Sequence, residues 1–247
     1  MRGGWPDPIT TEGKHALGVW QGALITAGFV GVFVIGLILA SALFFRRRSD
    51  DLPRQVRYNL PIEVLYTVVP VIIISVLFYF TAIRENDVDK FKTRPDLTVG
   101  VVGFQWAWQF VYPDDGFAIT GRPGEPPTLV LPVGKTVRFL ESSPDVVHSF
   151  WVVPFLFKRD VLPGRPNRFQ VTLTHTGTFA GKCTELCGID HDRMLFTLRV
   201  LPDAAYQTWL EQQKQIVASG GSPTVTTYDR NGSFARDFVG ETQRSHS

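Results

Sequence analysis

The sequence predicts an α+β membrane protein, in which an N-terminal two-helix transmembrane hairpin precedes an all-β domain and a C-terminal helix. Three observations support this fold class. Two long runs near the N-terminus, 16–45 and 64–83, contain no charged residue. Between about Asp96 and Pro202 the chain changes to short segments rich in β-branched and aromatic residues, separated by Gly and Pro. The stretch that follows Pro202 has helical spacing.

Both apolar runs are long enough to cross a bilayer, which takes a helix of about 20 apolar residues. We expect helices over about 16–45 and 60–84, within a hairpin unit of 16–95 that follows an extracytoplasmic arm at 1–15. A cleaved signal peptide has a shorter apolar core and occurs once, so it explains neither run well. Two buried helices of a soluble protein are the less favoured alternative.

The loop between the two runs predicts their orientation. It carries five arginines between Arg46 and Arg57, whereas the outer flanks are mixed in sign. The positive-inside rule places such a loop in the cytoplasm. We therefore expect a bacterial-type plasma-membrane protein whose termini and β domain lie on the extracytoplasmic side.

The β domain is expected over 96–201. Several short strands with turn signals between them favour an antiparallel sandwich or barrel. The segments that read as strands are 97–103, 104–112, 128–132, 136–142, 146–153, 168–174, 178–183 and 195–201.

A helix is expected over 202–218, with Asp203 as its N-cap. It would pack Tyr206, Trp209 and Leu210 against the sandwich. The remaining residues, 219–247, are polar and rich in Gly and Ser, which predicts a flexible or partner-bound tail. The net charge is only +2, so the composition makes no case for nucleic-acid binding.

Both cysteines of the chain lie in one stretch, C-T-E-L-C-G-I-D-H-D-R-M, from Cys183 to Met194. A turn-rich loop with this spacing can aim Cys183, Cys187, His191 and Met194 at one point. A disulfide is one interpretation, because the domain lies on the oxidising side. It would close too small a loop to stabilise the fold much, and it has no need of His191 or Met194. A zinc site is a second interpretation, but thioether is not a usual zinc ligand and the spacing is not that of a zinc finger or ribbon.

Copper suits this set of side chains better. Thiolate, imidazole and thioether are the soft ligands that select copper, and a second imidazole is available at His148 in D-V-V-H-S-F-W. A mononuclear blue-copper site uses one Cys, two His and a weak Met. Two thiolates, two histidines and one methionine exceed that need, and they suit two coppers that share both sulfurs.

The C-x3-C-x3-H-x2-M pattern, with D-V-V-H-S-F-W and Q-W-A-W upstream of it, resembles subunit II of the haem–copper cytochrome c oxidases. Quinol-oxidase subunits of similar topology lack this ligand set. The resemblance extends from the first apolar run to Val200, and it implies a cupredoxin-like Greek-key sandwich.

The resemblance also implies a function, that of subunit II in an aa3-type cytochrome c oxidase. A binuclear copper A centre would accept electrons from cytochrome c and pass them to haem in the catalytic subunit I, which reduces oxygen to water and translocates protons. The expected partners are subunit I, further oxidase subunits, the lipid bilayer and, as donor, cytochrome c or a membrane-tethered cytochrome c domain. The chain itself would hold no oxygen-reduction site.

The family pattern assigns a role to each ligand. Cys183 and Cys187 would bridge the coppers. His148 and the weak ligand Met194 would belong to one copper, and His191 with the backbone carbonyl of Glu185 to the other. The Glu185 carboxylate matches a position that reaches a magnesium ion shared with the catalytic subunit.

The segment G-F-Q-W-A-W-Q-F resembles the aromatic patch at which electrons enter from the donor. Alternation would put Trp106 and Trp108 on the same face of one strand, with Trp106 as the point of electron acceptance. A core tryptophan is the alternative interpretation. Ala107 departs from the family, which commonly has Tyr there.

Four acidic residues complete the candidate sites. Asp114, Asp115 and Asp145 match positions that attract a basic cytochrome, although Pro144 replaces a further acid of many members. Glu63 matches a glutamate near a proton-uptake pathway. A carboxyl at a membrane edge is costly enough to suggest function. Simple solvation at the cytoplasmic end is the alternative interpretation of Glu63.

Two alternatives of other classes stay open. One is a membrane-anchored copper-delivery protein without redox turnover, in which Trp106 and Glu63 would have no purpose. The other is the same copper domain serving a nitric-oxide reductase.

Overall fold

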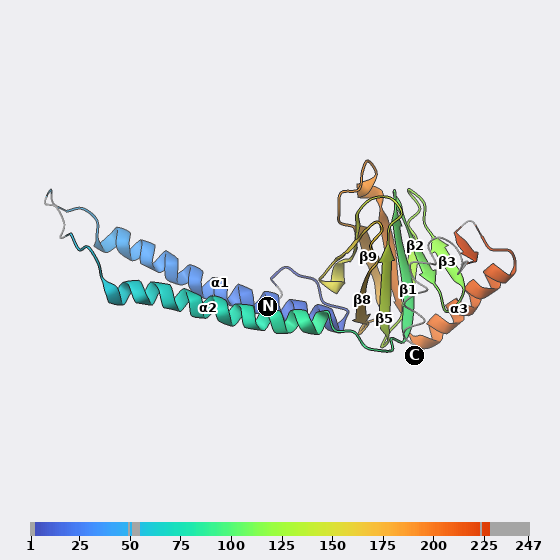
Figure 1. The fold of residues 1–247 in the computed structure, drawn as a ribbon, viewed down its shortest axis with the longest axis horizontal. Helices are drawn as coiled ribbons and strands as arrows, with labels where there is room; N and C mark the ends of the chain where they lie inside the picture. Colours follow the sequence, from blue (N-terminus) through green and yellow to red (C-terminus); the bar gives the residue numbers. More distant parts are fainter. Residues whose placement is uncertain (1–2, 49, 51–54, 223, 228–247) are drawn as a thin grey trace.

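The two apolar runs form long helices, α1 (Thr11–Phe44) and α2 (Leu60–Val88), which lie side by side and project from one side of a β-sandwich (Figure 1). The architecture comes from a computed structural model that describes residues 3–48, 50, 55–222 and 224–227. None of the residues in the most apolar window of either helix is buried within the chain. An apolar surface of this extent needs a bilayer or partner helices around it.

Helix α1 begins five residues earlier than the charge pattern predicts. Thr10 is its N-cap, and the Thr10 hydroxyl accepts a hydrogen bond from the Gly13 N–H at 2.9 Å. The end of the predicted N-terminal arm is therefore helical. The preceding residue, Ile9, is buried, and its backbone bonds to Pro154 at 3.2 Å and Thr174 at 2.8 Å. The arm thus ties the hairpin to the β domain.

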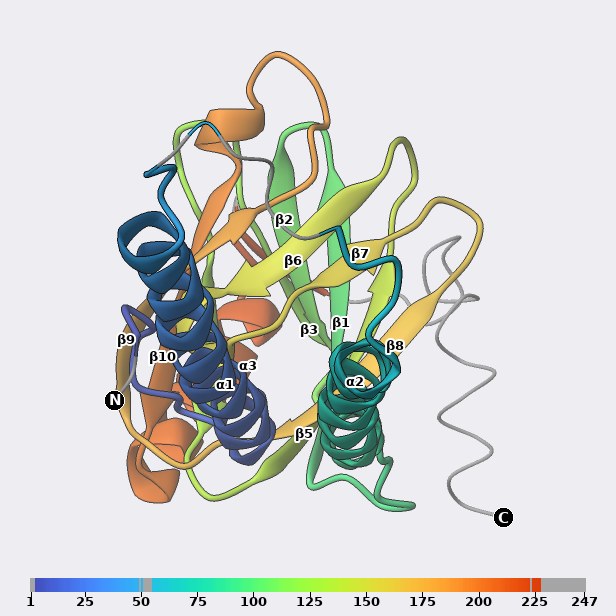
Figure 2. The same cartoon turned by 90° about the vertical axis from the view of Figure 1, so that its left-hand side faces the viewer.

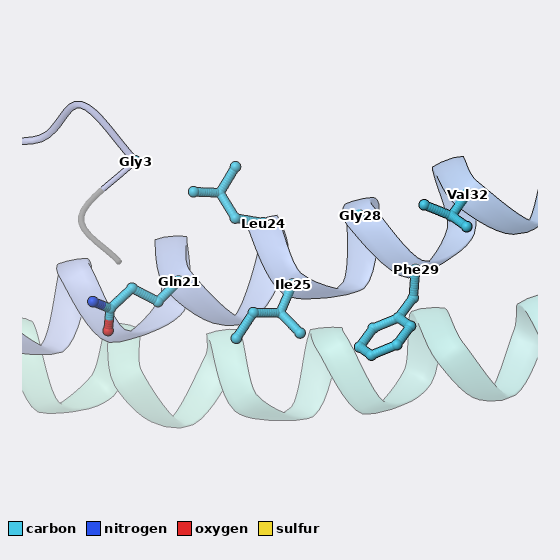
Figure 3. A pocket seen from close by; sticks show the side chains of 7 residues that line it. All are labelled: Gly3, Gln21, Leu24, Ile25, Gly28, Phe29 and Val32. Atoms are coloured by element: carbon cyan, nitrogen blue, oxygen red, sulfur yellow. The ribbon is translucent and has the colours of Figure 1, made fainter.

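A groove of about 810 Å³ runs along α1, beside the N-terminal arm at Gly3 (Figure 3). Its lining is almost entirely apolar and comprises Gly3, Gln21, Leu24, Ile25, Gly28, Phe29 and Val32. The groove belongs to the hairpin and contains none of the predicted metal ligands.

The sandwich consists of two sheets, which confirms the predicted fold class. The six-stranded sheet has the order β11-β3-β2-β1-β5-β8. Its strands are β1 (Leu97–Phe104), β2 (Ala107–Tyr112), β3 (Phe117–Thr120), β5 (Thr136–Ser142), β8 (Asn167–Thr172) and β11 (Val225–Thr227). The five-stranded sheet has the order β4-β10-β9-β6-β7. Its strands are β4 (Thr128–Pro132), β6 (His148–Val152), β7 (Arg159–Val161), β9 (Gly177–Cys183) and β10 (Leu195–Leu201).

The strand pairing differs from the prediction in two ways. The sheets are mixed rather than antiparallel, because β1 pairs with β5 and β4 with β10 in parallel. The segment 104–112, predicted as one strand, contains a reversal of the chain. Strand β1 ends at Phe104, β2 begins at Ala107, and the two form an antiparallel pair with Gly103 opposite Trp108. Gln105 and Trp106 therefore lie in a turn.

Aromatic side chains fill the space between the sheets. Phe150 stacks on Phe196 with ring centroids 4.8 Å apart, and Phe139 stacks on Phe169 at 4.7 Å. Burying large rings in this way dominates the energetics of such a core.

Helix α3 (Asp203–Ala218) covers the edge of the six-stranded sheet (Figure 1). Its residues Tyr206 and Leu210 are buried, and Trp209 packs against the Tyr112 ring at 5.5 Å, as predicted. Asp203 lies in the first turn and Pro202 holds the cap position, so the predicted N-cap was wrong by one residue. Part of the predicted tail, β11, pairs with β3 instead of remaining free. Residues 228–247 lie outside the described part of the chain.

The loop 184–194, which joins β9 to β10, rises at one end of the sandwich and is offset from the axis of the hairpin (Figure 2). It contains a short 3₁₀ helix, η2 (His191–Arg193). This loop and the adjacent strand ends form the candidate site.

Candidate metal centre

Strand pairing brings His148 and the cysteines together. Strands β6 and β9 are neighbours, with Phe150 opposite Cys183, and the Thr184 N–H donates to the Ser149 carbonyl at 3.1 Å. His148 begins β6 and Cys183 ends β9, so both side chains lie at the same end of the sheet. The ligand atoms of His148, Cys183 and Cys187 all lie within 4.8 Å of one another, and all three residues are buried. They form a group that could hold a metal ion.

The other predicted ligands complete the cluster. The Cys187 sulfur lies 3.9 Å from the Cys183 sulfur, 3.5 Å from His191 Nδ1 and 3.9 Å from Met194 Sδ. The Cys183 sulfur lies 3.9 Å from His148 Nδ1 and 3.3 Å from the Glu185 carbonyl oxygen. Each imidazole thus turns its Nδ1 toward a different sulfur. The spacing in the sequence predicted this convergence of side chains.

Both cysteines are free, and a sulfur–sulfur distance of 3.9 Å is far longer than a disulfide bond. Burial alone would raise the pKa of Cys183, but the hydrogen bonds that it receives from His148 and nearby backbone hold its pKa below the usual value. Burial, together with repulsion from the Cys183 thiolate, raises the pKa of Cys187. Repulsion between the two sulfurs therefore opposes ionisation of both cysteines, and a bound cation would offset that repulsion.

Asp145 contacts a predicted ligand directly, which the sequence did not indicate. Its Oδ1 lies 2.9 Å from His148 Nε2, and its Oδ2 accepts a hydrogen bond from the Gln105 N–H at 2.8 Å. Burial would raise the pKa of Asp145, but these hydrogen bonds and that from the Val146 N–H lower it. A carboxylate on the outer nitrogen of a histidine fixes which nitrogen is free to bind a metal.

Gln105 is a functional candidate that sequence reasoning missed. Its side-chain amide donates to the Cys187 carbonyl at 2.7 Å, while its backbone N–H holds Asp145. The Q-W-A-W motif contained the residue, but an amide is not a copper ligand and gave no reason to select it.

The two tryptophans do not lie on one strand, because Trp106 belongs to the turn that precedes β2, although both pack against the same core cluster. Trp106 is half-buried in the turn, and its Nε1–H donates to the Cys187 carbonyl at 3.2 Å. Trp108 is fully buried in β2, and its Nε1–H donates to the Met194 carbonyl at 3.3 Å. Ala107, between them, is also buried.

The predicted docking acids do not gather at one place. Asp114 and Asp115 follow Tyr112, at the opposite end of β2 from Trp106, and a strand of that length spans roughly 20 Å. Asp115 pairs with Lys214 of α3 at 3.1 Å, and Asp114 is exposed. Only Asp145 lies beside the predicted ligands.

Two further predicted carboxylates have partners within the chain. Glu185 lies on the ligand loop, and its Oε2 is 3.8 Å from Lys158 Nζ. Glu63 accepts a hydrogen bond from the Asn59 N–H at 2.9 Å in the first turn of α2. Such a contact satisfies a free backbone donor at the start of a helix.

Comparison with known proteins places this geometry in a family. Residues 10–82 match the transmembrane domain of cytochrome c oxidase subunit II, and residues 126–201 match its periplasmic domain. A protein of Streptomyces avermitilis described as a probable cytochrome c oxidase subunit 2 is 45% identical over 271 residues, covering 92% of this chain and 85% of the relative. The chain belongs to the cytochrome c oxidase subunit II family.

A second relative agrees with this assignment. The cytochrome c oxidase subunit 2 of Mycobacterium bovis is 35% identical over 270 residues, covering 85% of this chain and 74% of the relative. The crystal structure of the periplasmic domain of cytochrome oxidase subunit II from Bradyrhizobium japonicum is 36% identical, with a TM-score of 0.46, covering 49% of this chain and 96% of that one. As a member of the subunit II family, the chain combines a membrane-anchoring hairpin with a copper A-type domain.

Proposed function

We propose that this chain is the electron-accepting subunit of an aa3-type cytochrome c oxidase. It would take electrons from cytochrome c at a binuclear copper A centre and pass them to haem in the catalytic subunit. The observation that carries this proposal is the convergence of two thiols, two imidazole Nδ1 atoms and one thioether, with neighbouring ligand atoms 3.5–3.9 Å apart. This donor set is soft throughout and fits copper.

In this proposal Cys183 and Cys187 would be shared by the two coppers, His148 and Met194 would complete one site, and His191 with the Glu185 carbonyl would complete the other. When bound, the copper pair supplies an acceptor in which one electron is shared between two metals, so that little geometry changes on reduction. The burial of Met194 and both cysteines keeps water away from the sulfur ligands. The proximity of the Glu185 carbonyl to the Cys183 sulfur supports its place in the set.

Trp106 would provide the route by which electrons reach the centre. Its indole is half-exposed, and its N–H is bonded to the carbonyl of Cys187. One hydrogen bond therefore separates a surface π-system from the residue that carries a bridging sulfur. A copper-delivery protein would have no use for this connection.

The other roles concern the assembled oxidase. The Glu185 carboxylate would offer an oxygen ligand to a magnesium ion at the interface with the catalytic subunit, where the ion would take over from Lys158. Glu63 would lie near proton uptake at the cytoplasmic end of α2. The arginine-rich loop would lie in the cytoplasm, and the copper domain would face cytochrome c, or a tethered cytochrome c domain, outside a bacterial plasma membrane.

A rapid-mixing experiment tests this function. The full chain, purified in detergent and loaded with copper, is mixed with reduced cytochrome c. We expect oxidation of the cytochrome and bleaching of the copper absorption with the same time course. Zinc-loaded chain is the control, because zinc binds cysteine and histidine and does not change its oxidation state. Copper binding without electron transfer would instead support the delivery protein.

A further inference from the structure

Trp108 contacts two of the proposed copper ligands from inside the sandwich. Its Nε1–H donates to the Met194 carbonyl at 3.3 Å, and its ring lies edge-on to the His148 ring with centroids 6.2 Å apart. Trp108, His148 and Met194 are all fully buried. These contacts involve the ligand residues themselves, and both ligands belong to the same copper in the proposed arrangement.

The Met194 carbonyl has two donors, and together they fix where the ligand loop ends. The Cys183 N–H donates to this carbonyl at 3.0 Å, in addition to Trp108. Met194 closes η2, and β10 begins at the next residue. The indole therefore anchors the loop at the point where the weak thioether ligand leaves the backbone.

Gly103 lets Trp108 and His148 approach each other. It lies opposite Trp108 in the pairing of β1 with β2. A Cβ atom at this position would lie 3.1 Å from Trp108 Cζ3 and 3.3 Å from two atoms of His148. The His148 ring therefore packs closely against the Trp108 ring, and a side chain at position 103 would push them apart.

We propose that Trp108 is a positioning residue of the copper centre. It holds the Met194 backbone by its N–H and the His148 imidazole by its ring, and thereby sets the geometry of one of the two coppers. This role rests on the proposed function, because it presupposes that His148 and Met194 bind copper. Groups that orient the ligands of a metal tune its affinity and its redox potential without touching it.

A neighbouring phenylalanine offers a matched control. Phe110 lies two residues along β2 and is equally buried, and it packs against Phe150 and Phe196 as Trp108 does. Phe110 and Trp108 thus make the same edge-on contacts with the core rings. Among the described residues, however, no ring–ring contact of Phe110 involves a proposed ligand. A purely structural tryptophan would behave like Phe110.

The test compares Trp108→Phe with Phe110→Leu in the full chain in detergent. Trp108→Phe retains a buried ring and removes the N–H donor. We expect its copper affinity to fall about tenfold to a hundredfold, with a changed hyperfine pattern and a shifted reduction potential. Phe110→Leu should lower thermal stability and leave the copper spectrum and potential at their wild-type values. Thermal unfolding of the metal-free chains checks that both variants fold.

The outcomes separate the two proposals. If the wild-type chain gives no spectrum of a shared electron, the proposed function itself fails. If the wild type gives that spectrum and Trp108→Phe reproduces it with the same potential and affinity, Trp108 is a core residue and the inference is overturned. Equal spectral changes in both variants would also overturn it, because core loosening alone would then account for them. Should Trp108→Phe fail to fold, Trp108→Tyr replaces it in the same comparison.

Discussion

The two ends of β2 carry similar residues and differ in what those residues contact. At the ligand end, Trp106 and Gln105 donate to the Cys187 carbonyl, and Asp145 holds His148. At the helix end, Tyr112 bonds to the backbone of Val130 and packs under α3, while Asp115 pairs with Lys214. Aromatic and acidic residues occur at both ends. Only their bonds to ligand residues distinguish a functional end from a structural one.

The largest effect expected from this difference is on electron transfer. Trp106→Leu keeps an apolar side chain and removes the π-system between the donor and the centre. Copper content and spectrum should stay as they are, because Gln105 still donates to the Cys187 carbonyl at 2.7 Å. Reduction by cytochrome c should slow by orders of magnitude, because tunnelling decays exponentially with distance. The measurement is flash-induced reduction of the copper centre.

Trp209→Leu is the matched control, because Trp209 is also half-buried but lies at the helix end. It should reduce stability and leave the electron-transfer rate unchanged. Equal rates in wild type and Trp106→Leu would return Trp106 to the status of a core tryptophan.

Removing the charge of Asp145, beside the proposed ligands, or of Asp115, beside α3, compares the same two ends of the sandwich. Asp145→Asn keeps an oxygen near His148 but removes the carboxylate, so copper affinity should fall about tenfold to a hundredfold. Asp115→Asn weakens an ion pair with Lys214 far from the proposed ligands, and should leave copper binding unchanged. Competition with a chelator measures both affinities. If Asp145→Asn weakens only the binding of cytochrome c, and only at low salt, Asp145 is a docking acid and not a positioning residue.

A smaller effect is expected from Glu141, which lies toward the ligand end because β5 runs parallel to β1. Its side chain is fully buried, and neither oxygen has a hydrogen-bond partner among the described residues. Burial raises the pKa of Glu141 well above its usual value. Replacing an unsatisfied buried group by an apolar one of similar size should therefore raise the free energy of unfolding, by about 1–3 kcal/mol at neutral pH.

The pH dependence of Glu141→Leu has a definite sign. A carboxyl whose pKa is higher in the folded than in the unfolded state destabilises the fold as the pH rises through the range between the two values. The loss is complete once the pH exceeds the folded-state pKa. The advantage of Glu141→Leu over wild type should therefore grow as the pH rises from below 4.5, the usual glutamate value, toward the raised folded value. Denaturant unfolding of the metal-free chain at a series of pH values measures it, with exposed Asp114→Ala as the control. An advantage that shrinks with rising pH would mean that Glu141 has an ionic partner in the fold.

Features formed by contiguous residues could be predicted well from the sequence, whereas local reversals of the chain could not. Apolar runs and ligand spacing are properties of contiguous residues, so the hairpin and the convergence of Cys183 and Met194 could be anticipated. The turn at Gln105–Trp106 has no Gly or Pro to mark it and lies between apolar strands, so it was taken for part of a strand. Short strands such as β3 and β7, and the parallel pairing of β1 with β5, depend on residues distant in the chain. The contact of Trp108 with Met194 joins residues far apart in the chain and was missed for the same reason. The contact of Asp145 with His148 spans only three residues, but the sequence of this loop does not show that the two side chains turn toward each other.

The most direct test of the central claim is an electron paramagnetic resonance spectrum of the full chain loaded with copper, together with its copper content. Two coppers that share both sulfurs should give two metal ions per chain and a seven-line pattern from one electron on two nuclei. Cys187→Ser should lose this pattern, because one sulfur alone cannot bridge both metals symmetrically. A four-line pattern from a single copper in the wild type, or a seven-line pattern that survives in Cys187→Ser, would contradict the account.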